Sequence, residues 1–269
     1  MEYTLNVRGR LMELSTPQVM GIVNVTPDSF FAGSRVQTEE EIAVRCRQMV
    51  TDGATLIDVG ACSTRPGSEP ASQAEEMERL RMALAVVRRT LPEAVVSVDT
   101  FRPDVARMVV EEFGADIIND VSGGSPDMFR LVAKMGVPYI LTSVHPDMRS
   151  MLLTFAAAVQ QLRDFGQKDI ILDPGFGFGK TLEQNYEVMS HLEQLQVMEL
   201  PLLVGISRKS MIYRLTGTTP EASLNGTTIL NTVALMKGAS ILRVHDVKEA
   251  VECVKMVGEI VSYEIRVKK

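Results

Sequence analysis

Residues 94–119 read AVVSVDTFRPDVARMVVEEFGADIIN, and this stretch contains the pattern that decides the fold. The apolar, largely β-branched runs at 94–98 and 116–118 predict two short strands. Between them, DVARMVVEEFGA repeats apolar residues at intervals of three and four and closes on a glycine, as an amphipathic helix does. A strand, a helix and a second strand in this order predict a βαβ unit with parallel strands.

The same alternation continues along the whole chain. Six more strands are predicted, at 19–25, 55–59, 137–141, 169–172, 202–206 and 240–244. Helices are predicted between them, for example at 39–54, 73–91 and 127–136. Such units in 269 residues favour a (β/α)8 TIM barrel, since that fold takes about 250 residues. A doubly wound open sheet is the alternative.

Two further features of the sequence predict an N-terminal hairpin and a single domain. Residues 1–18 alternate polar and apolar residues and predict a short antiparallel β-hairpin that closes the bottom of the barrel. No linker rich in Pro, Gly or Ser and no shift in composition divides the sequence. We therefore expect one domain over residues 1–269.

Composition limits the partners. The chain has 28 Lys and Arg against 34 Asp and Glu, a net charge of −6, which disfavours nucleic acid or an anionic membrane as a partner. No stretch is long and apolar enough to cross a membrane, and the N-terminus has no signal-peptide pattern. The cysteines Cys46, Cys62 and Cys253 are widely separated, as expected for buried free thiols. These features predict a cytoplasmic protein.

Polar residues follow the predicted strands. They are Asn24, Asp58, Asp99, Asn119, Asp173, Ser207 to Lys209, and Arg243 to His245. In a parallel barrel the carboxyl ends of all strands face one mouth, so these side chains predict a polar site there. Any one of them alone could instead be a helix cap or a loop hydrogen bond.

The residue types indicate the ligand. Asp99, Asn119 and Asp173 can form paired, coplanar hydrogen bonds, which suit a flat heterocycle with adjacent N–H and amino groups. Lys209, Arg243 and His245 would bring positive charge for a phosphate or diphosphate. The site is thus expected to bind a polar ring on one side and an anion on the other.

The glycine-rich stretch DPGFGFGKT at 173–181 matches neither the P-loop spacing nor G-x-G-x-x-G. Its glycines would let the backbone approach a ligand closely, with Phe178 offering an apolar face to a ring. The alternative is a flexible loop that carries a core phenylalanine.

Motifs that occur in order resemble those of the dihydropteroate synthase family. They are GIVNVTPDSF (21–30), IDVGACSTRPGS (57–68), SVDT (97–100), IINDVSG (117–123), DPGFGFGKT (173–181), GISRKS (205–210) and RVHDV (243–247). The resemblance spans about residues 17–260. It implies a homodimeric TIM barrel that condenses 6-hydroxymethyl-7,8-dihydropterin diphosphate with p-aminobenzoate to give 7,8-dihydropteroate and diphosphate.

The resemblance also implies a role for each matching residue. Asp99, Asn119, Asp173 and Lys209 would line the pterin pocket. Arg243 and His245 would bind the diphosphate, and Asn24 would contribute to the same region and to a bound Mg2+. Thr64 and Arg65 would close over the diphosphate and the second substrate, and Phe30, Pro66, Phe178 and Ser210 would frame the p-aminobenzoate site. Asp99, Lys209 and Arg65 are the expected catalytic residues.

Three positions depart from the family pattern. Ala32 stands where the family commonly has an aspartate credited with stabilising the cation, and Asp28 is a candidate replacement. The stretch LTSVHPDM (141–148) changes the pocket lining at residues 142–144, and Ala61 and Cys62 replace a frequent Gly-Glu. These departures leave open a pterin-binding paralogue without catalysis. A methyltransferase barrel of the methyltetrahydrofolate type is a second alternative, because it shares the fold and the pterin-binding carboxylates.

Overall fold

The computed structural model describes residues 3–25, 35–62 and 71–267, and its main feature is an eight-stranded parallel sheet. The sheet order is β8-β7-β6-β5-β4-β3-β10-β9. The strands are β3 Gln18–Asn24, β4 Leu56–Gly60, β5 Val95–Asp99, β6 Ile117–Asp120, β7 Tyr139–Thr142, β8 Ile170–Asp173, β9 Leu203–Val204 and β10 Ile241–Val244. All eight lie within two residues of the predicted strand positions.

The two edges of this sheet meet. Leu172 on β8 forms a parallel bridge with Leu202, and its N–H donates to the carbonyl of Pro201 at 2.9 Å. The sheet therefore curls into a nearly closed barrel, which confirms the TIM barrel over the open sheet. The strand expected at 202–206 is shorter, because Gly205 and Ile206 already lead into a turn in which Lys209 N–H donates to the Ile206 carbonyl.

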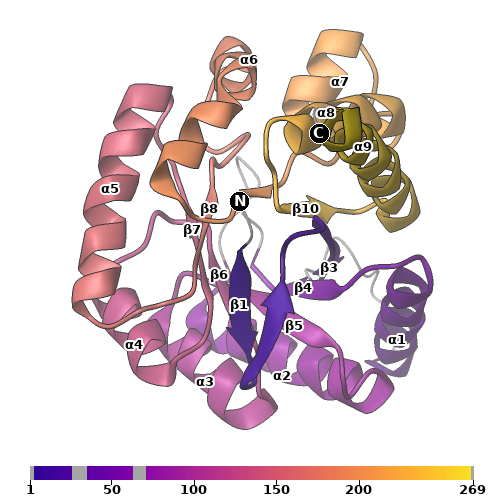
Figure 1. Cartoon of the computed structure of the whole chain (residues 1–269). Helices are drawn as coiled ribbons and strands as arrows, with labels where there is room; N and C mark the ends of the chain where they lie inside the picture. The colour runs from indigo at the N-terminus through magenta and orange to yellow at the C-terminus, as the bar shows by residue number, and fades with distance from the viewer. Residues whose placement is uncertain (1–2, 26–34, 63–70, 268–269) are drawn as a thin grey trace.

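Helices surround the barrel and follow the strands in sequence (Figure 1). They are α1 Arg35–Thr51, α2 Gln73–Thr90, α3 Pro103–Phe113, α4 Pro126–Met135, α5 Met148–Asp164, α6 Leu182–Ser190, η1 Leu192–Met198, α7 Ser210–Thr216, α8 Leu224–Met236 and α9 Val247–Val267. Local chemistry sets their limits: Ser72 and Glu75 form a capping box at the start of α2, and Gly114 ends α3 in the left-handed conformation.

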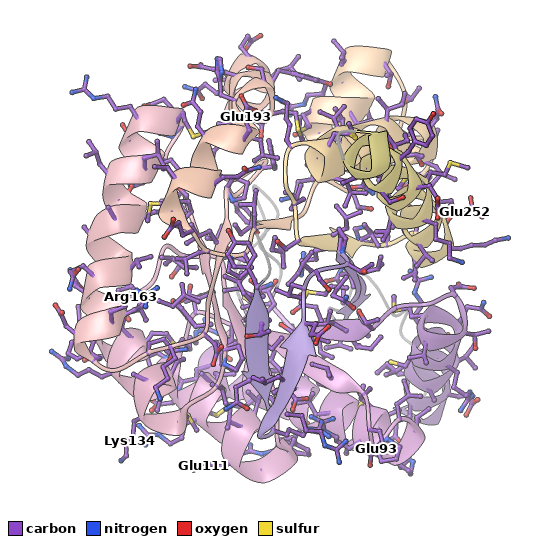
Figure 2. The ribbon with its side chains drawn as sticks, in the orientation of Figure 1. Glu93, Glu111, Lys134, Arg163, Glu193 and Glu252 are labelled. Carbon is purple, nitrogen blue, oxygen red and sulfur yellow. The ribbon has the colours of Figure 1, made fainter. Side chains whose placement is uncertain are left out.

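Apolar side chains fill the space between the sheet and the helices, and charged ones face solvent. Leu80, Leu84 and Val87 of α2 are fully buried, as the apolar stripe of an amphipathic helix requires. Figure 2 shows exposed charges such as Glu111 and Lys134 on the outer helices. In the described residues no helix could span a membrane.

A second, smaller core fills the lower part of the barrel. The hairpin formed by β1 (Thr4–Val7) and β2 (Arg10–Glu13) places Leu5, Val7 and Leu14 against the barrel interior. They pack there with Met20, Leu56, Ile117, Ile140, Ile171, Leu203 and Ile241. The predicted hairpin is thus confirmed, and burial of these side chains seals the bottom of the barrel.

An ion cluster fastens the hairpin to the barrel. Arg8, at the hairpin turn, donates through Nε and an NH2 nitrogen to the two carboxylate oxygens of Asp116, at 2.5 and 2.8 Å. Arg88 donates to the same carboxylate at 3.1 Å, and Val96 N–H does so at 2.8 Å. Because the Asp116 side chain is only 1% exposed, these donors replace the water that its carboxylate loses on folding.

We expect Arg8→Ala to lower the free energy of unfolding by about 1–2 kcal/mol, since it leaves a buried carboxylate with fewer donors. Activity should stay within twofold, because the bottom of the barrel lies opposite the strand carboxyl ends. Chemical denaturation measures the first quantity. Arg10→Ala, an exposed neighbour on β2, is the control, and equal stability of both variants would contradict this role for Arg8.

Candidate functional site

The polar side chains of the barrel interior come from alternate positions on the strands. On β4 the inward series is Leu56, Asp58 and Gly60, and strand pairing places Asp58 beside Ser97 and Gly60 beside Asp99. Because side chains alternate along a strand, most strands present an apolar residue to the lower core and a polar residue above it. The sequence pattern therefore gathers polar side chains near the carboxyl ends of the strands, and we call this interior region the chamber.

Arg243 of β10 forms the centre of this chamber. Its Nε donates to Asp58 Oδ2 at 2.7 Å, and one NH2 nitrogen lies 2.6 Å from the same oxygen and 3.0 Å from Asp99 Oδ2. Asn119 Nδ2 also donates to Asp58 Oδ2, at 3.3 Å. One guanidinium thus compensates two carboxylates across the barrel.

Burial perturbs the acid–base behaviour of Asp99. Removal from water raises the pKa of Asp99 to about 7, with Arg243 opposing the shift and Asp58 adding to it. The carboxyl therefore changes charge near neutral pH in the ligand-free protein. A strongly shifted pKa beside other buried charged groups is typical of a functional site.

Several buried acceptors in the chamber have no hydrogen-bond partner within the described residues. These atoms are Asp58 Oδ1, Asn119 Oδ1, Ser97 Oγ and Thr142 Oγ1. A buried polar atom without a partner costs free energy, and a ligand that carries N–H donors would satisfy these acceptors. The chamber is therefore suited to a polar ring.

Lys209 and Phe178 form the opposite wall. The Lys209 ammonium donates to the Phe176 carbonyl and lies 4.5 Å from the centre of the Phe178 ring. Burial lowers the pKa of Lys209 to about 8, although Asp173 opposes that shift. Asp173 itself accepts from Gly175 N–H at 2.8 Å. The wall thus combines a cation, a carboxylate and an aromatic face, and Phe178 is not a core residue.

His245 does not carry the positive charge expected from the sequence. Burial lowers its pKa to about 4, and the nearby Arg243 lowers it further, so the imidazole is neutral at pH 7. Its Nδ1 lies 3.1 Å from Ser207 Oγ, which also accepts from His245 N–H at 3.1 Å. His245 can therefore offer a hydrogen bond, whereas Arg243 and Lys209 supply the charge.

Arg208 is oriented differently from its neighbour Lys209. It adopts a positive φ of 57° and forms a two-point ion pair with Asp246, with distances of 3.0 and 2.5 Å. This pair links the loop after β9 to the loop after β10. Arg208 thereby fixes the backbone next to Lys209. Ser210, which follows Lys209, is the first residue of α7.

Asn24 and Asp99 lie on either side of Gly60. A Cβ atom at Gly60 would be 3.7 Å from Asn24 Oδ1 and 3.7 Å from Asp99 Oδ2. Because glycine has no side chain, both oxygens border the small space that a Cβ at residue 60 would fill. Four predicted site residues, Phe30, Thr64, Arg65 and Pro66, lie outside the described residues, as do Asp28 and Ala32.

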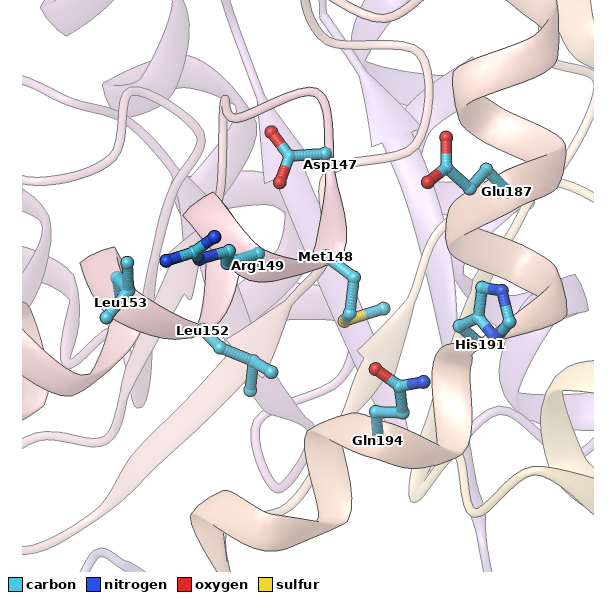
Figure 3. A pocket seen from close by; sticks show the side chains of 8 residues that line it. All are labelled: Asp147, Met148, Arg149, Leu152, Leu153, Glu187, His191 and Gln194. Atoms are coloured by element: carbon cyan, nitrogen blue, oxygen red, sulfur yellow. The ribbon is translucent and has the colours of Figure 1, made fainter.

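One surface cavity lies apart from the chamber. It has a volume of about 520 Å³ and is lined by Asp147, Met148, Arg149, Leu152, Leu153, Glu187, His191 and Gln194. Figure 3 shows these side chains between α5 and the segment formed by α6 and η1. None of the strand-end residues lines it, so it is not part of the candidate site.

Four residues of the chamber have no role that the sequence predicted: Asp58, Ser97, Thr142 and Ser207. Asp58 and Ser207 are nevertheless among the polar residues that follow the predicted strands. For Asp58 a signal exists in the sequence: it lies two residues after the inward-facing Leu56 in an otherwise apolar strand. A period of two would have placed its carboxylate inside the barrel.

Fold and site together define a (β/α)8 protein with one mixed-charge chamber for a flat polar ring and an anion. Residues 20–245 match the family model described as pterin binding enzyme. The chain is 37% identical over 274 residues to the dihydropteroate synthase of Escherichia coli K12, which covers 96% of each protein. It therefore belongs to the dihydropteroate synthase family of pterin-binding barrels, the transferases of folate biosynthesis.

Two solved structures agree with this assignment. A Yersinia pestis dihydropteroate synthase with a sulfonamide drug superposes with a TM-score of 0.88, at 36% identity over 97% of this chain and all of the other. The Xanthomonas albilineans enzyme with 4-aminobenzoic acid gives a TM-score of 0.86, at 35% identity over 97% and 98% of the two chains.

Proposed function

We propose that this protein condenses 6-hydroxymethyl-7,8-dihydropterin diphosphate with p-aminobenzoate. The C–O bond between the pterin methylene and diphosphate breaks, a C–N bond to the arylamine forms, and the amine loses a proton. The observation that carries the proposal is the chamber itself, in which Arg243 spans Asp58 and Asp99 beside unpaired buried acceptors. Its residue types match both ends of this substrate.

The pterin ring would occupy the interior of the chamber. Its amino and N–H groups are donors, and Asn119 Oδ1 is a buried acceptor without a partner. Asp99 and Asp173 supply carboxylates on the two sides of the chamber, and Lys209 supplies a donor for the ring carbonyl. Asp58, which is fully buried, orients Arg243 and Asn119 from below.

The diphosphate would lie at the mouth, next to Arg243 and His245. Arg243 offers a fixed cationic fork for the negative charge that develops on the leaving group. Neutral His245 donates a hydrogen bond at the same end. Loss of diphosphate leaves positive charge on the pterin methylene, which the ionised Asp99 stabilises, and the weakly basic arylamine then needs no strong general base.

Mg2+ fits the residues at this mouth. The oxygens of Asn24 and Asp99 flank Gly60, and Mg2+ commonly takes one or two protein oxygens together with substrate phosphates. The described residues contain no cluster of three His, Cys, Asp or Glu that would bind a metal alone. When bound, the ion would neutralise charge on the diphosphate. We expect Asn24→Ala to need a higher Mg2+ concentration for half-maximal activity, and an unchanged requirement would contradict a role for Asn24.

The second substrate, p-aminobenzoate, would bind next to the loops that follow β8 and β9. Phe178 presents its ring at the chamber wall, and Ser210 follows Lys209 at the start of α7. Together with Phe30 and Pro66, which lie outside the described residues, they are proposed to frame p-aminobenzoate. Thr64 and Arg65 are proposed to close over the diphosphate and the second substrate. We also place the activity in the cytoplasm.

A homodimer is part of the proposal. α8 exposes Ile229 and Met236, and α9 exposes Met256, Ile260 and Tyr263. Helical spacing puts each set on one face of its helix, and the two helices lie together in Figure 1. Exposed apolar side chains of this kind favour burial against a second copy. Sedimentation equilibrium should give twice the chain mass, and a monomer at micromolar concentration would exclude the dimer.

Complementation tests the function in a cell. The chain is introduced into a bacterial strain that lacks its own dihydropteroate synthase and cannot grow without folate end products. We expect the unaltered chain to restore growth and Lys209→Ala to fail at equal protein level. No growth with the unaltered chain, despite folded protein in the extract, would contradict the proposal.

A further inference from the structure

Lys180 is a partly buried cation outside the set of predicted site residues. Its ammonium donates to three backbone carbonyls: Gly175 at 3.0 Å, Ser143 at 3.2 Å and Phe178 at 3.3 Å. An ammonium group has three N–H donors, so all of them are used. Two of the carbonyls belong to the loop after β8 and one to the loop after β7.

These two loops pack most closely at Gly175. A Cβ there would lie 2.0 Å from the Ser143 carbonyl oxygen, which leaves no room for a side chain, whereas one at Gly179 would lie 3.4 Å from the Val144 carbonyl oxygen, an ordinary contact. Both glycines have positive φ, 67° and 62°, which other residues adopt only with strain. Carbonyl oxygens are thereby brought together, and a cation among them offsets their mutual repulsion.

The loop that Lys180 bridges carries the chamber wall. Its Phe176 carbonyl accepts from Lys209, and its Phe178 ring lies against the same ammonium. Asn185 of α6 supports the loop from the other side, because its Oδ1 accepts from Gly177 N–H at 2.7 Å. Any displacement of this loop would move both the Phe178 ring and the carbonyl partner of Lys209.

We propose that Lys180 is a positioning residue that fixes the loop after β8 against the loop after β7, and so sets the Phe178 face that receives p-aminobenzoate. The expected effect on the KM for p-aminobenzoate rests on the proposed function, whereas the expected effect on the position of the loop after β8 does not. Burial lowers the pKa of Lys180 to about 8, against the opposing effect of Asp173, so the ammonium predominates at neutral pH.

Lys180→Met tests the proposal, since it keeps the length of the side chain and removes the three donors. We expect the KM for p-aminobenzoate to rise about tenfold with kcat within about threefold, as loss of charge-assisted hydrogen bonds loosens the wall. In a double-mutant cycle, Lys180→Met and Phe178→Ala together should raise the KM for p-aminobenzoate by less than the sum of their separate effects, because Lys180 acts on that KM through the Phe178 ring. Additive effects on KM, or a KM within twofold of the unaltered protein, would overturn the proposal.

Hydrogen–deuterium exchange provides a readout that does not depend on turnover. We expect Lys180→Met to speed exchange at the amides of 143–145 and 175–179, while Lys168→Met, which alters an exposed lysine before β8, leaves them unchanged. If the unaltered protein makes no dihydropteroate, the proposed function fails, yet exchange still decides the role of Lys180. If Lys180→Met does not fold, Lys180→Gln keeps two donors, and faster exchange over the same segments is again the expected result; unchanged exchange overturns the role.

Discussion

Asp99→Asn is expected to lower kcat/KM at least about a hundredfold, the scale seen when one preorganised electrostatic group is removed from an active site. The amide keeps the shape of the carboxylate but carries no charge to offset the cation at the pterin methylene. It also ends the ion pair with Arg243, which lies 3.0 Å from Asp99 Oδ2. Steady-state kinetics with both substrates measures the effect.

Because of the raised pKa of Asp99, pterin binding should depend on pH near neutrality. Because burial raises that pKa to about 7, lowering the pH through 7 protonates the carboxyl and removes an acceptor for pterin N–H groups. Arg243, Asp58, Asp120 and Glu76 also act on this carboxyl. Calorimetry with 6-hydroxymethyl-7,8-dihydropterin, which lacks the titrating diphosphate, should show weaker binding at pH 6 than at pH 8, and Asp99→Asn should flatten that dependence.

Asp147→Ala is the control for Asp99→Asn. Asp147 is the N-cap of α5, where its side chain accepts from Ser150 N–H at 2.9 Å. Its loss should lower the stability slightly, because an N-cap is removed, and leave kcat/KM within about threefold, since Asp147 lies outside the chamber. Equal losses of activity in both variants would contradict the assignment of Asp99 to the site.

Arg243→Met should affect stability and activity together. Without the guanidinium, Asp58 loses its buried ion-pair partner and the pKa of Asp99 rises further, since Arg243 opposes that rise. Loss of one partner from a buried ion pair costs about 3–5 kcal/mol. The Asp58 side chain is fully buried, so little water can compensate it. Turnover should fall to background, because the main cation of the diphosphate end is gone.

The double variant Asp58→Asn, Arg243→Met separates these two effects. Neutralising Asp58 removes the uncompensated charge, so a substantial part of the stability lost in Arg243→Met should return while activity does not. Chemical denaturation and kinetics on the single and double variants measure this coupling. A double variant less stable than Arg243→Met would contradict the view that Arg243 compensates Asp58.

The fold was largely predictable because each strand is a short apolar run and each helix has a clear period. Strand limits shifted by one or two residues, and β9 ended early where Ile206 is buried but lies in a turn. An apolar run in the sequence indicates burial only, so it cannot distinguish a buried loop residue such as Ile206 from a buried strand residue. The location of the polar site followed from parallel strands alone.

The details of the site depended on contacts between strands far apart in sequence. Arg243 meets Asp58 and Asp99 only because β10, β4 and β5 contribute to one barrel, so the ion network could not be read from spacing. The neutral state of His245 follows from burial next to Arg243, which no local pattern reveals. The bridging role of Lys180 likewise requires two loops to lie in contact.

Diphosphate release measured with and without p-aminobenzoate is the most direct test of the proposed condensation reaction. Purified protein is given dihydropterin diphosphate and Mg2+, and dihydropteroate is quantified by mass. We predict one dihydropteroate for each diphosphate released in the presence of p-aminobenzoate, and loss of both products in Asp99→Asn. Binding of the pterin with no product would contradict the account and indicate a binding protein, and methyl transfer from methyltetrahydrofolate would indicate a methyltransferase.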